Sequence, residues 1–263
     1  MQMSLPKPND GFAWTQEAWG PALRCLALLD IAPHLFTTRQ LELAGAHHRG
    51  AAGWDSVTAA IGSASDRLVR PRQVHGTAVM VVSRDRRAMR EEREPIDADI
   101  VVTDDPGTIA AVQIADCVPL LVADQRSGVV AAAHSGWRGT AAGVAAATVA
   151  AMCSAFHVNP ADLVAAIGPS IGPCCYEVGE LLIDAFRRAG HASRDIERWF
   201  RRDGGLRLDL WTANRDQLEA AGLRPDRIHV AGLCTATHGD LFHSYRRDGS
   251  SAGRLAAAIR PGR

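Results

Sequence analysis

Lysine and aromatic residues are scarce in this sequence, and neither sign of charge is in excess. Lys7 is the only lysine among 263 residues, aromatic side chains make up 5%, and 29 basic residues balance 29 acidic ones. A chain without net charge has no overall field that attracts nucleic acid or an anionic membrane. We therefore expect neither as a partner, and nothing in the composition points to an obligate protein partner.

Long apolar runs are missing as well. The longest, Gly143–Phe156, is rich in alanine and falls short of the roughly 20 apolar residues that a membrane-spanning helix needs. No basic region followed by an apolar stretch occurs in the opening residues, MQMSLPKPND, so we expect no signal peptide and a cytoplasmic location. The six cysteines follow no disulfide-framework spacing, which fits a reducing compartment.

The remaining composition is that of an ordinary globular chain. Hydrophobic residues make up 47% and charged residues 22%, which is typical of a compact protein with a substantial core. We expect one domain over residues 1–263, with a weakly patterned part at 1–70 and a motif-bearing part at 71–260. The charge run RDRRAMREER, Arg84–Arg93, is expected to be a solvated loop or helix face.

Short apolar and β-branched runs alternate with helical patterns along the chain. Strands are expected at Leu35–Thr38, Ala78–Val82, Asp99–Thr103, Thr108–Gln113, Val118–Ala123, Val129–Ala133, Leu163–Ile167, Ile228–Leu233, Leu241–Ser244 and Arg254–Ile259. Helices are expected at Gly139–Ala155, Val178–Ala189, Ile196–Arg201 and Leu210–Ala221. This mixture predicts a layered α/β or α+β fold rather than a β-sandwich or a helical bundle.

The strongest chemical signal lies in residues 128–144, GVVAAAHSGWRGTAAGV. An apolar strand runs into His134, a Gly-flanked turn follows, and a helix is expected to begin near Gly139. Proteins of the α/β class build sites at such strand ends, and a helix N-terminus beside Arg138 suits phosphate or another oxyanion. The same pattern is also common scaffolding, in which His134 closes a turn and Arg138 pairs with a surface carboxylate.

Two further residues complete a candidate metal site. Cys117 lies between two apolar strands beside Asp116, and His75 lies in a turn before another strand. Two imidazoles and a thiolate with an open fourth position are typical of catalytic zinc, and the same donors with a weak axial ligand hold blue copper. The His-X-His pairs of a multicopper cluster are missing, with His47–His48 the only close pair, and so is the zinc-deaminase signature. Because the separations match no local metal motif, only the fold can bring His75, Cys117 and His134 together.

A glycine- and proline-rich loop follows the strand at residues 163–167. It carries Cys174, Cys175, Tyr176 and Glu177. Adjacent cysteines are poorly placed to chelate one metal ion, and a disulfide between them would be strained. The loop therefore fits either substrate binding or a rigid turn with a buried Tyr and Cys.

Residues 232–254 hold a second group of polar side chains, namely Cys234, His238, His243, Arg246 and Arg247. The strand expected at 241–244 places neighbouring side chains on opposite faces. We expect most of this segment to be architectural, with one or two residues lining a pocket.

Six motifs occur in an order that resembles one known family. They are RQVHG (72–76), ADIVVT (98–103), ADCVPLLVAD (115–124), AAHSGWRGTAAGV (132–144), IGPSIGPCCYEVG (167–179) and FHSYRRDG with AGR (242–254). Together they look like the laccase-domain, or multicopper polyphenol oxidase, family, now largely regarded as purine nucleoside phosphorylases with adenosine deaminase activity. The likeness spans about residues 70–260, whereas residues 1–70 diverge.

The resemblance implies a fold, a metal and a reaction. The fold is a four-layer α/β/β/α arrangement with mixed sheets, related to a group of cysteine hydrolases. The family's zinc ligands correspond to His75, Cys117 and His134, the trio reached above from donor chemistry. The reaction is zinc-dependent phosphorolysis of adenosine and inosine, with deamination of adenosine, so the implied partners are a purine nucleoside and phosphate.

Further residues are implied around the metal. Candidate catalytic residues are Asp116, Arg138 and Glu177, and candidate substrate- or phosphate-binding residues are Arg39, Gln73, Arg138 and Tyr176. Phosphate held by arginines would attack C1′ through an oxocarbenium-like transition state. Deamination would use water activated by zinc, with Asp116 or Glu177 as the proton carrier.

Three other functions stay open from the sequence. One is a copper-dependent polyphenol oxidase. Another is a Cys–His hydrolase, such as an amidase on a cell-wall precursor, in which His75 or His134 activates Cys117 as the nucleophile. The third is a metal-binding protein without catalytic activity.

Overall fold

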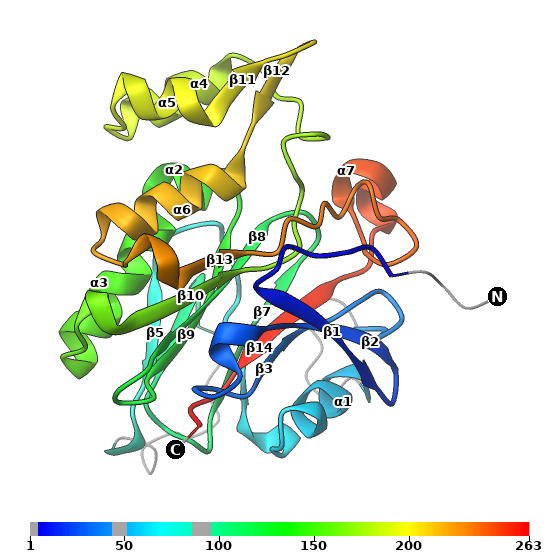
Figure 1. Ribbon diagram of the computed structural model, residues 1–263, viewed down its shortest axis with the longest axis vertical. Helices are drawn as coiled ribbons and strands as arrows, with labels where there is room; N and C mark the ends of the chain where they lie inside the picture. Colours follow the sequence, from blue (N-terminus) through cyan, green and yellow to red (C-terminus); the bar gives the residue numbers. More distant parts are fainter. Residues whose placement is uncertain (1–4, 44–51, 86–95, 263) are drawn as a thin grey trace.

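Two six-stranded sheets form the centre of the computed structural model, which describes residues 5–43, 52–85 and 96–262 (Figure 1). The expected solvated run over residues 86–93 and the His47–His48 pair lie outside the described residues.

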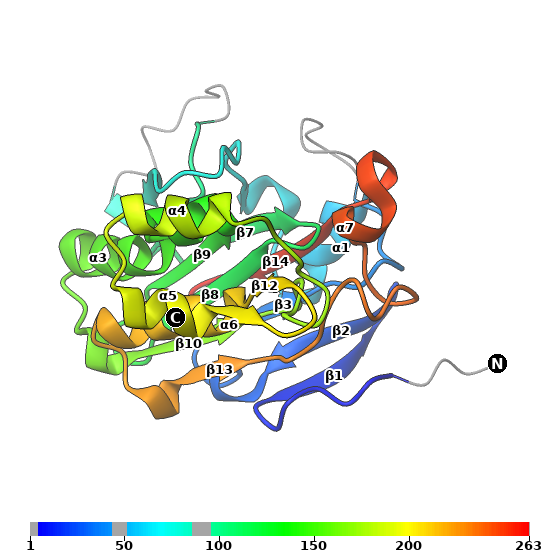
Figure 2. The same ribbon diagram turned by 90° about the horizontal axis from the view of Figure 1, so that it is seen from above.

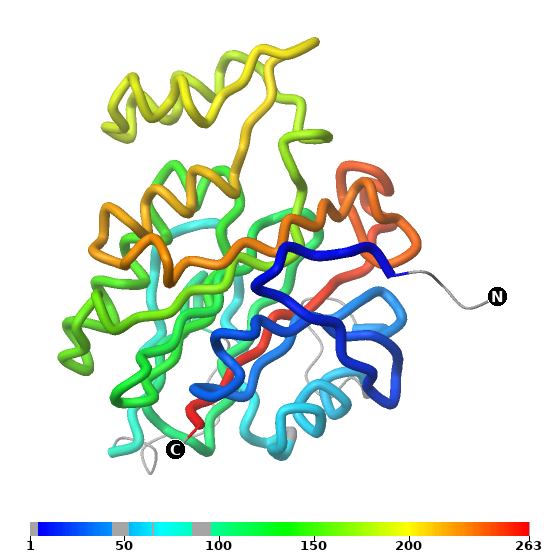
Figure 3. The backbone as a smooth tube through the Cα atoms, viewed as in Figure 1, coloured from blue at the N-terminus to red at the C-terminus, as the bar shows by residue number. Residues whose placement is uncertain are grey.

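The first sheet joins the N-terminal strands to the C-terminal strand (Figure 3). Its order is β1 (Phe12–Glu17), β2 (Gly20–Cys25), β3 (His34–Phe36), β14 (Leu255–Ile259), β7 (Ile109–Ile114) and β4 (Leu68–Val69). The β4–β7 pair is parallel and the other neighbours are antiparallel, so this sheet is mixed.

The second sheet positions the candidate metal ligands. Its order is β13 (Ile228–Val230), β10 (Leu163–Ile167), β8 (Val118–Asp124), β9 (Val130–Ser135), β6 (Ile100–Thr103) and β5 (Val79–Val82). It is mixed as well, with parallel pairs β10–β13 and β5–β6. The antiparallel register of β8 and β9 sets Pro119 opposite His134, so Cys117, just before β8, comes next to the end of β9.

Several helices lie against the outer faces of the sheets, whereas the two helices between residues 181 and 199 pack on other helices (Figures 1 and 2). The helices are α1 (Ala52–Ala60), α2 (Trp137–Ala142), α3 (Val144–Phe156), α4 (Leu181–Arg188), α5 (Ser193–Trp199), α6 (Leu210–Ala220) and α7 (Tyr245–Asp248). The hairpin β11 (Phe200–Arg202) and β12 (Leu206–Leu208) follows α5. Within the described ranges, no helix has the length and apolar character needed to cross a membrane.

Three buried clusters hold the elements together. One packs the second sheet against α2, α3 and α6, one fills the space between the two sheets, and the third packs α1 on the first sheet through Trp54. Side chains alternate along a strand, so Leu120 of β8 belongs to the first cluster while its neighbour Leu121 belongs to the second. Both faces of the second sheet are therefore buried, so a binding site on this sheet can reach solvent only at the ends of its strands.

The expected mixture of strands and helices is confirmed, but two segments differ. The strand expected at Leu241–Ser244 is wrong, because these residues lead into α7 and the Ser244 hydroxyl caps that helix by accepting the N–H of Arg247. The helix expected at Gly139–Ala155 is two helices. It begins at Trp137 and breaks at Gly143, whose φ of 84° is left-handed and suits glycine.

The N-terminal part is more regular than its sequence pattern suggested. The β1–β2 hairpin pairs six residues on each strand, and β3 extends the sheet towards β14. Pairing with distant strands, rather than local alternation, builds this region.

Candidate metal centre and active-site cavity

His75, Cys117 and His134 converge on one point, and together they are called the metal centre below. Their ligand atoms all lie within 4.8 Å of one another. The Cys117 Sγ is 4.0 Å from the His75 Nε2, and the two imidazole rings stand nearly perpendicular with centroids 4.7 Å apart. His134 is buried, Cys117 half-buried and His75 exposed, so the group reaches from the core to the surface.

The backbone at this point takes conformations that most residues avoid. His75 has a φ of 62° and Asp116, directly before Cys117, has a φ of 85°. Gly136 follows the end of β9, and a Cβ there would lie 2.8 Å from the Cys117 Sγ. Positive φ in non-glycine residues costs roughly 1–3 kcal/mol each and concentrates at functional sites. This conformational cost falls at the residues that orient the side chains of His75 and Cys117.

A buried carboxylate, Asp99, lies behind both histidines. It is fully shielded from solvent and accepts the Nδ1–H of His134 at 2.8 Å. It also accepts the backbone N–H groups of Val74, His75 and Gly76 at 3.2, 3.0 and 2.7 Å. The His134 Nε2 is thereby left as the metal-facing nitrogen, which is how histidine ligands are usually held. Sequence reasoning missed Asp99, although an acid at the start of an apolar strand was a usable signal.

The charges within the metal centre are strongly coupled. Burial alone raises the pKa of Cys117, but the charge of His134 and hydrogen bonds from both histidines outweigh it and lower that pKa to about 6. Burial likewise lowers the pKa of His134, but the Cys117 thiolate and Asp99 raise it to about 9. Burial also opposes ionisation of Asp99, yet hydrogen bonds from His134 and Gly76 lower its pKa. The cysteine therefore rests as a thiolate, the form that binds metals.

The metal centre opens into a cavity of about 700 Å³. That volume is typical of sites for small organic molecules. Both tyrosines of this aromatic-poor chain, Tyr176 and Tyr245, line it, together with Trp137. Tyr176 was expected here, whereas Tyr245 and Trp137 were missed. Because the chain has only two tyrosines, the rarity of this residue could have marked Tyr245 as a candidate.

Arginines give the cavity a basic wall. Arg138 lines it and stacks on Trp137, with its Cζ 4.3 Å from the ring centroid. Within the described part of the chain, no carboxylate forms an ion pair with Arg138, contrary to the scaffolding interpretation. Arg246 lies 5.1 Å above the Tyr176 ring and donates to the Glu177 carbonyl at 2.8 Å. These guanidinium groups suit an anionic ligand such as phosphate.

Two expected pocket residues build the cavity wall rather than offer free groups. The Gln73 amide pairs with the backbone N–H and C=O of Gln113, both at 2.8 Å. The Asp116 carboxylate accepts the Thr235 hydroxyl and the Arg246 backbone N–H, both at 2.6 Å. Gln113 was not expected here, and its buried side-chain Nε2 has no hydrogen-bond partner among the described residues.

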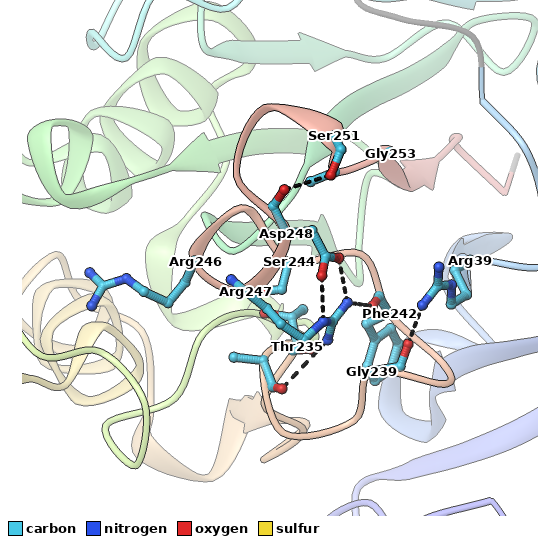
Figure 4. A network of polar contacts seen from close by, with 12 residues as sticks. Arg39, Thr235, Gly239, Phe242, Ser244, Arg246, Arg247, Asp248, Ser251 and Gly253 are labelled. Atoms are coloured by element: carbon cyan, nitrogen blue, oxygen red, sulfur yellow. Dashed lines mark hydrogen bonds and ion pairs between the residues drawn. The ribbon is translucent and has the colours of Figure 1, made fainter.

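The remaining two candidates, Arg39 and Glu177, lie outside the residues that line the cavity. Figure 4 shows Arg39 directed at the carbonyl of Gly239, to which it donates a hydrogen bond. Glu177 has an exposed side chain and forms an isolated backbone bridge with Arg207. Their catalytic and phosphate-binding roles stay predictions without support from this geometry.

Comparisons with known proteins identify the family of this chain. Residues 44–261 match the family described as multi-copper polyphenol oxidoreductase laccase. The chain belongs to this laccase-domain family. A relative from Deinococcus radiodurans, named purine nucleoside phosphorylase, is 38% identical over 253 residues, which is 91% of this chain and 93% of the relative.

Two further relatives of this laccase-domain protein are informative. Adenosine deaminase RL5, from an unknown prokaryotic organism, is 36% identical over 74% of this chain and 75% of its own length. The crystal structure of YlmD from Geobacillus stearothermophilus superposes with a TM-score of 0.80 at 32% identity, covering 94% of this chain and 98% of that one. The mixed α/β fold with two mixed sheets is therefore shared with a solved member.

Proposed function

We propose that this protein is a zinc-dependent purine nucleoside phosphorylase that cleaves adenosine and inosine and also deaminates adenosine. The observation that carries the proposal is that the metal centre lines a cavity whose wall also carries arginine and aromatic side chains. The names of the relatives support the choice of a purine nucleoside as the substrate class.

The donor set fits zinc. Two imidazole nitrogens and one thiolate leave a fourth position open, as in catalytic zinc sites, and Asp99 orients one imidazole. When bound, zinc supplies a Lewis acid that polarises oxygen groups and lowers the pKa of water. His75, Cys117 and His134 would hold it.

The cavity walls can serve both substrates of phosphorolysis. Arg138 and Arg246 would hold phosphate so that one oxygen attacks C1′ while the bond from C1′ to the purine nitrogen breaks. Tyr176 and Tyr245 offer aromatic faces to a purine. The unpartnered Nε2 of Gln113 would donate to a nitrogen or oxygen of the base and so help to hold the purine in the cavity.

The carboxylates have different roles in this proposal. Asp116 uses both oxygens to fix Thr235 and Arg246, so we assign it to positioning the arginine rather than to proton transfer. Arg39 and Glu177 have no part in the proposed chemistry because they lie outside the cavity lining.

The proposal also includes three expectations about the order of the layers, the domain organisation and the cellular location. The three buried clusters support the four-layer α/β/β/α order, and the expected kinship with cysteine hydrolases stays a prediction. Pairing of β3 with β14 supports a single domain that includes residues 1–70. The six unpaired cysteines support a reducing, cytoplasmic location.

Product analysis tests the proposed function. Adenosine is incubated with protein of measured metal content, with and without phosphate, and the products are separated by chromatography. Adenine and ribose 1-phosphate formed only with phosphate are expected, together with inosine from deamination. Unchanged adenosine in a zinc-loaded sample with phosphate would contradict the proposal.

One specific observation favours a second candidate. Without a metal, Cys117, His134 and Asp99 have the order of a Cys–His–Asp nucleophilic group, with a thiolate beside a charged imidazole. This arrangement suits a Cys–His hydrolase, including an amidase. Hydrolysis that continues in metal-free protein and stops after alkylation of Cys117 would select this candidate instead.

A further inference from the structure

A second group of thiols lies apart from the metal centre. Cys174, Cys175 and Cys234 have their Sγ atoms within 4.8 Å of one another, and we call them the cysteine cluster. The first two belong to the loop after β10, and the third belongs to the segment after β13. No residue is shared with the metal centre, so the cluster is a separate set of donors.

A turn in the backbone lets the two adjacent cysteines face the same way. The N–H groups of Cys175 and Tyr176 both bond to the carbonyl of Gly172 at 3.0 Å, which is a helix-like turn. In such a turn successive side chains diverge far less than along a strand. Both thiols consequently contact the Thr237 hydroxyl, at 3.5 and 3.4 Å. The expectation that adjacent cysteines are poorly placed to chelate one metal ion applies to extended chain, whereas this turn brings both thiols to the same hydroxyl.

The third thiol, that of Cys234, is held in place by contacts within the protein. Cys234 is buried and accepts the backbone N–H of Gly172 at 3.2 Å. Two backbone hydrogen bonds at Ser170 join the two segments. The Ser170 N–H donates to the Leu233 carbonyl at 3.2 Å, and the Ser170 carbonyl accepts the N–H of Thr235 at 3.0 Å. Hydrogen bonds from N–H groups to sulfur stabilise a thiolate, so Cys234 is prepared as a ligand.

The dimensions suit a thiophilic ion. With zinc–sulfur bonds of about 2.3 Å, sulfurs on one tetrahedral zinc lie roughly 3.8 Å apart. The three Sγ atoms already lie within 4.8 Å of one another, so the side chains need to close by at most about 1 Å in this geometry. Cys174 is exposed and gives an entry path, and the Thr237 hydroxyl or water can complete the coordination.

We propose that Cys174, Cys175 and Cys234 form a second metal site that binds one thiophilic ion, zinc(II) or copper(I), through three sulfurs. The ion would tie the loop of residues 172–176 to residues 234–237. Tyr176 follows Cys175 and lines the cavity, and Thr235 follows Cys234 and donates to Asp116. The second site therefore braces one wall of the cavity without contacting the metal centre.

Equilibrium metal binding tests this proposal without any activity measurement. Reduced, metal-free protein is dialysed against zinc(II) in one arm and copper(I) in the other, and bound metal is measured by elemental analysis. The native chain is expected to bind two equivalents in at least one arm, and that arm identifies the ion. Cys174→Ser is expected to bind one equivalent, with at least a tenfold loss of affinity for the second.

Cys153→Ser is the matched control, because Cys153 lies in α3 outside both groups of ligands. It is expected to bind as many equivalents as the native chain. A native chain that binds one equivalent in both arms, or a Cys174→Ser variant that still binds two, would overturn the second site.

Protection from alkylation gives a reading that does not depend on a variant folding. In the loaded native protein, Cys174, Cys175 and Cys234 should be protected relative to metal-free protein, as measured by peptide mass spectrometry. Equal labelling with and without metal, or a disulfide within the cluster, would count against the proposal. Because neither test uses a nucleoside, failure here leaves the proposed catalytic function untouched.

Discussion

The protein holds the ligands of the metal centre with more buried charge and more backbone strain than it uses for the cysteine cluster. The metal centre has a fully buried carboxylate behind it and left-handed backbone at His75 and Asp116. The cysteine cluster comes from an ordinary turn and is held by one N–H of Gly172 and the hydroxyl of Thr237. Strain and buried charge are found where chemistry is proposed, whereas the simpler arrangement suits a structural ion.

The largest expected effect is loss of a ligand from the metal centre. His134→Ala should abolish binding at that centre and reduce turnover by more than 100-fold, because changes to outer partners alone cost about 10- to 100-fold. Elemental analysis and product chromatography measure both effects. The exposed His157→Asn variant is the control and should match the native protein. If His134→Ala kept the metal at that centre, His134 would not be a required ligand, and the contrast drawn between the metal centre and the cysteine cluster would fail.

The thiols of the two groups should differ in reactivity by about 100-fold in metal-free protein at pH 7. Burial raises the pKa of Cys174 to about 11, whereas that of Cys117 is about 6. The thiolate fraction of Cys117 is then larger by roughly 10⁴, and its lower intrinsic nucleophilicity offsets roughly 10² of this. Alkylation of Cys117 should fall only as pH drops below about 6, while that of Cys174 should rise up to about pH 11.

Iodoacetamide labelling followed by peptide mass spectrometry measures these rates. Cys174 is the more exposed of the two thiols, so access alone predicts the opposite order. Faster labelling of Cys174 than Cys117 at pH 7 would contradict the assignment of a thiolate to the metal centre.

Asp99→Asn should weaken metal binding by about 10- to 100-fold, because the amide no longer holds His134 as a charged acceptor does. Competition with a chelator gives the affinity, and the cysteine cluster should bind as before. Asp124→Asn replaces another buried carboxylate, one that binds the turn after β8, and should leave the metal affinity unchanged. Equal affinities in the two variants would refute the role of Asp99.

A smaller effect is expected at Gln113. Replacement by leucine removes the unpartnered side-chain amide while the backbone contacts with Gln73 remain. One lost hydrogen bond to the base is worth about 1.4 kcal/mol, so KM should rise about tenfold with kcat nearly unchanged. Thermal unfolding should show no loss of stability, because no buried partner is left unsatisfied. An unchanged KM would remove Gln113 from the binding surface.

Residues at strand ends were the predictable part of the site. His134 follows an apolar strand and Cys117 interrupts two, so local pattern was enough to select them. Asp99 and Gln113 were not selected, because their roles depend on contacts with residues 23 to 40 positions away. Tyr245 was missed because a strand was expected directly before it, whereas Ser244 caps a short helix that begins at Tyr245.

The fold shows the same division. β8 and β10 were predictable because strands buried on both faces are continuous apolar runs. The β1–β2 hairpin was not, because it pairs with β3, which is itself held in the sheet by β14 from the other end of the chain.

Activity during metal reconstitution tests most directly the claim that the metal centre carries catalysis. Zinc is added stepwise to metal-free Cys174→Ser protein, and phosphate-dependent release of adenine from adenosine is measured at each step. The account predicts that activity rises linearly and stops rising at one equivalent. Full activity before any zinc is added, or none at saturation, would contradict it.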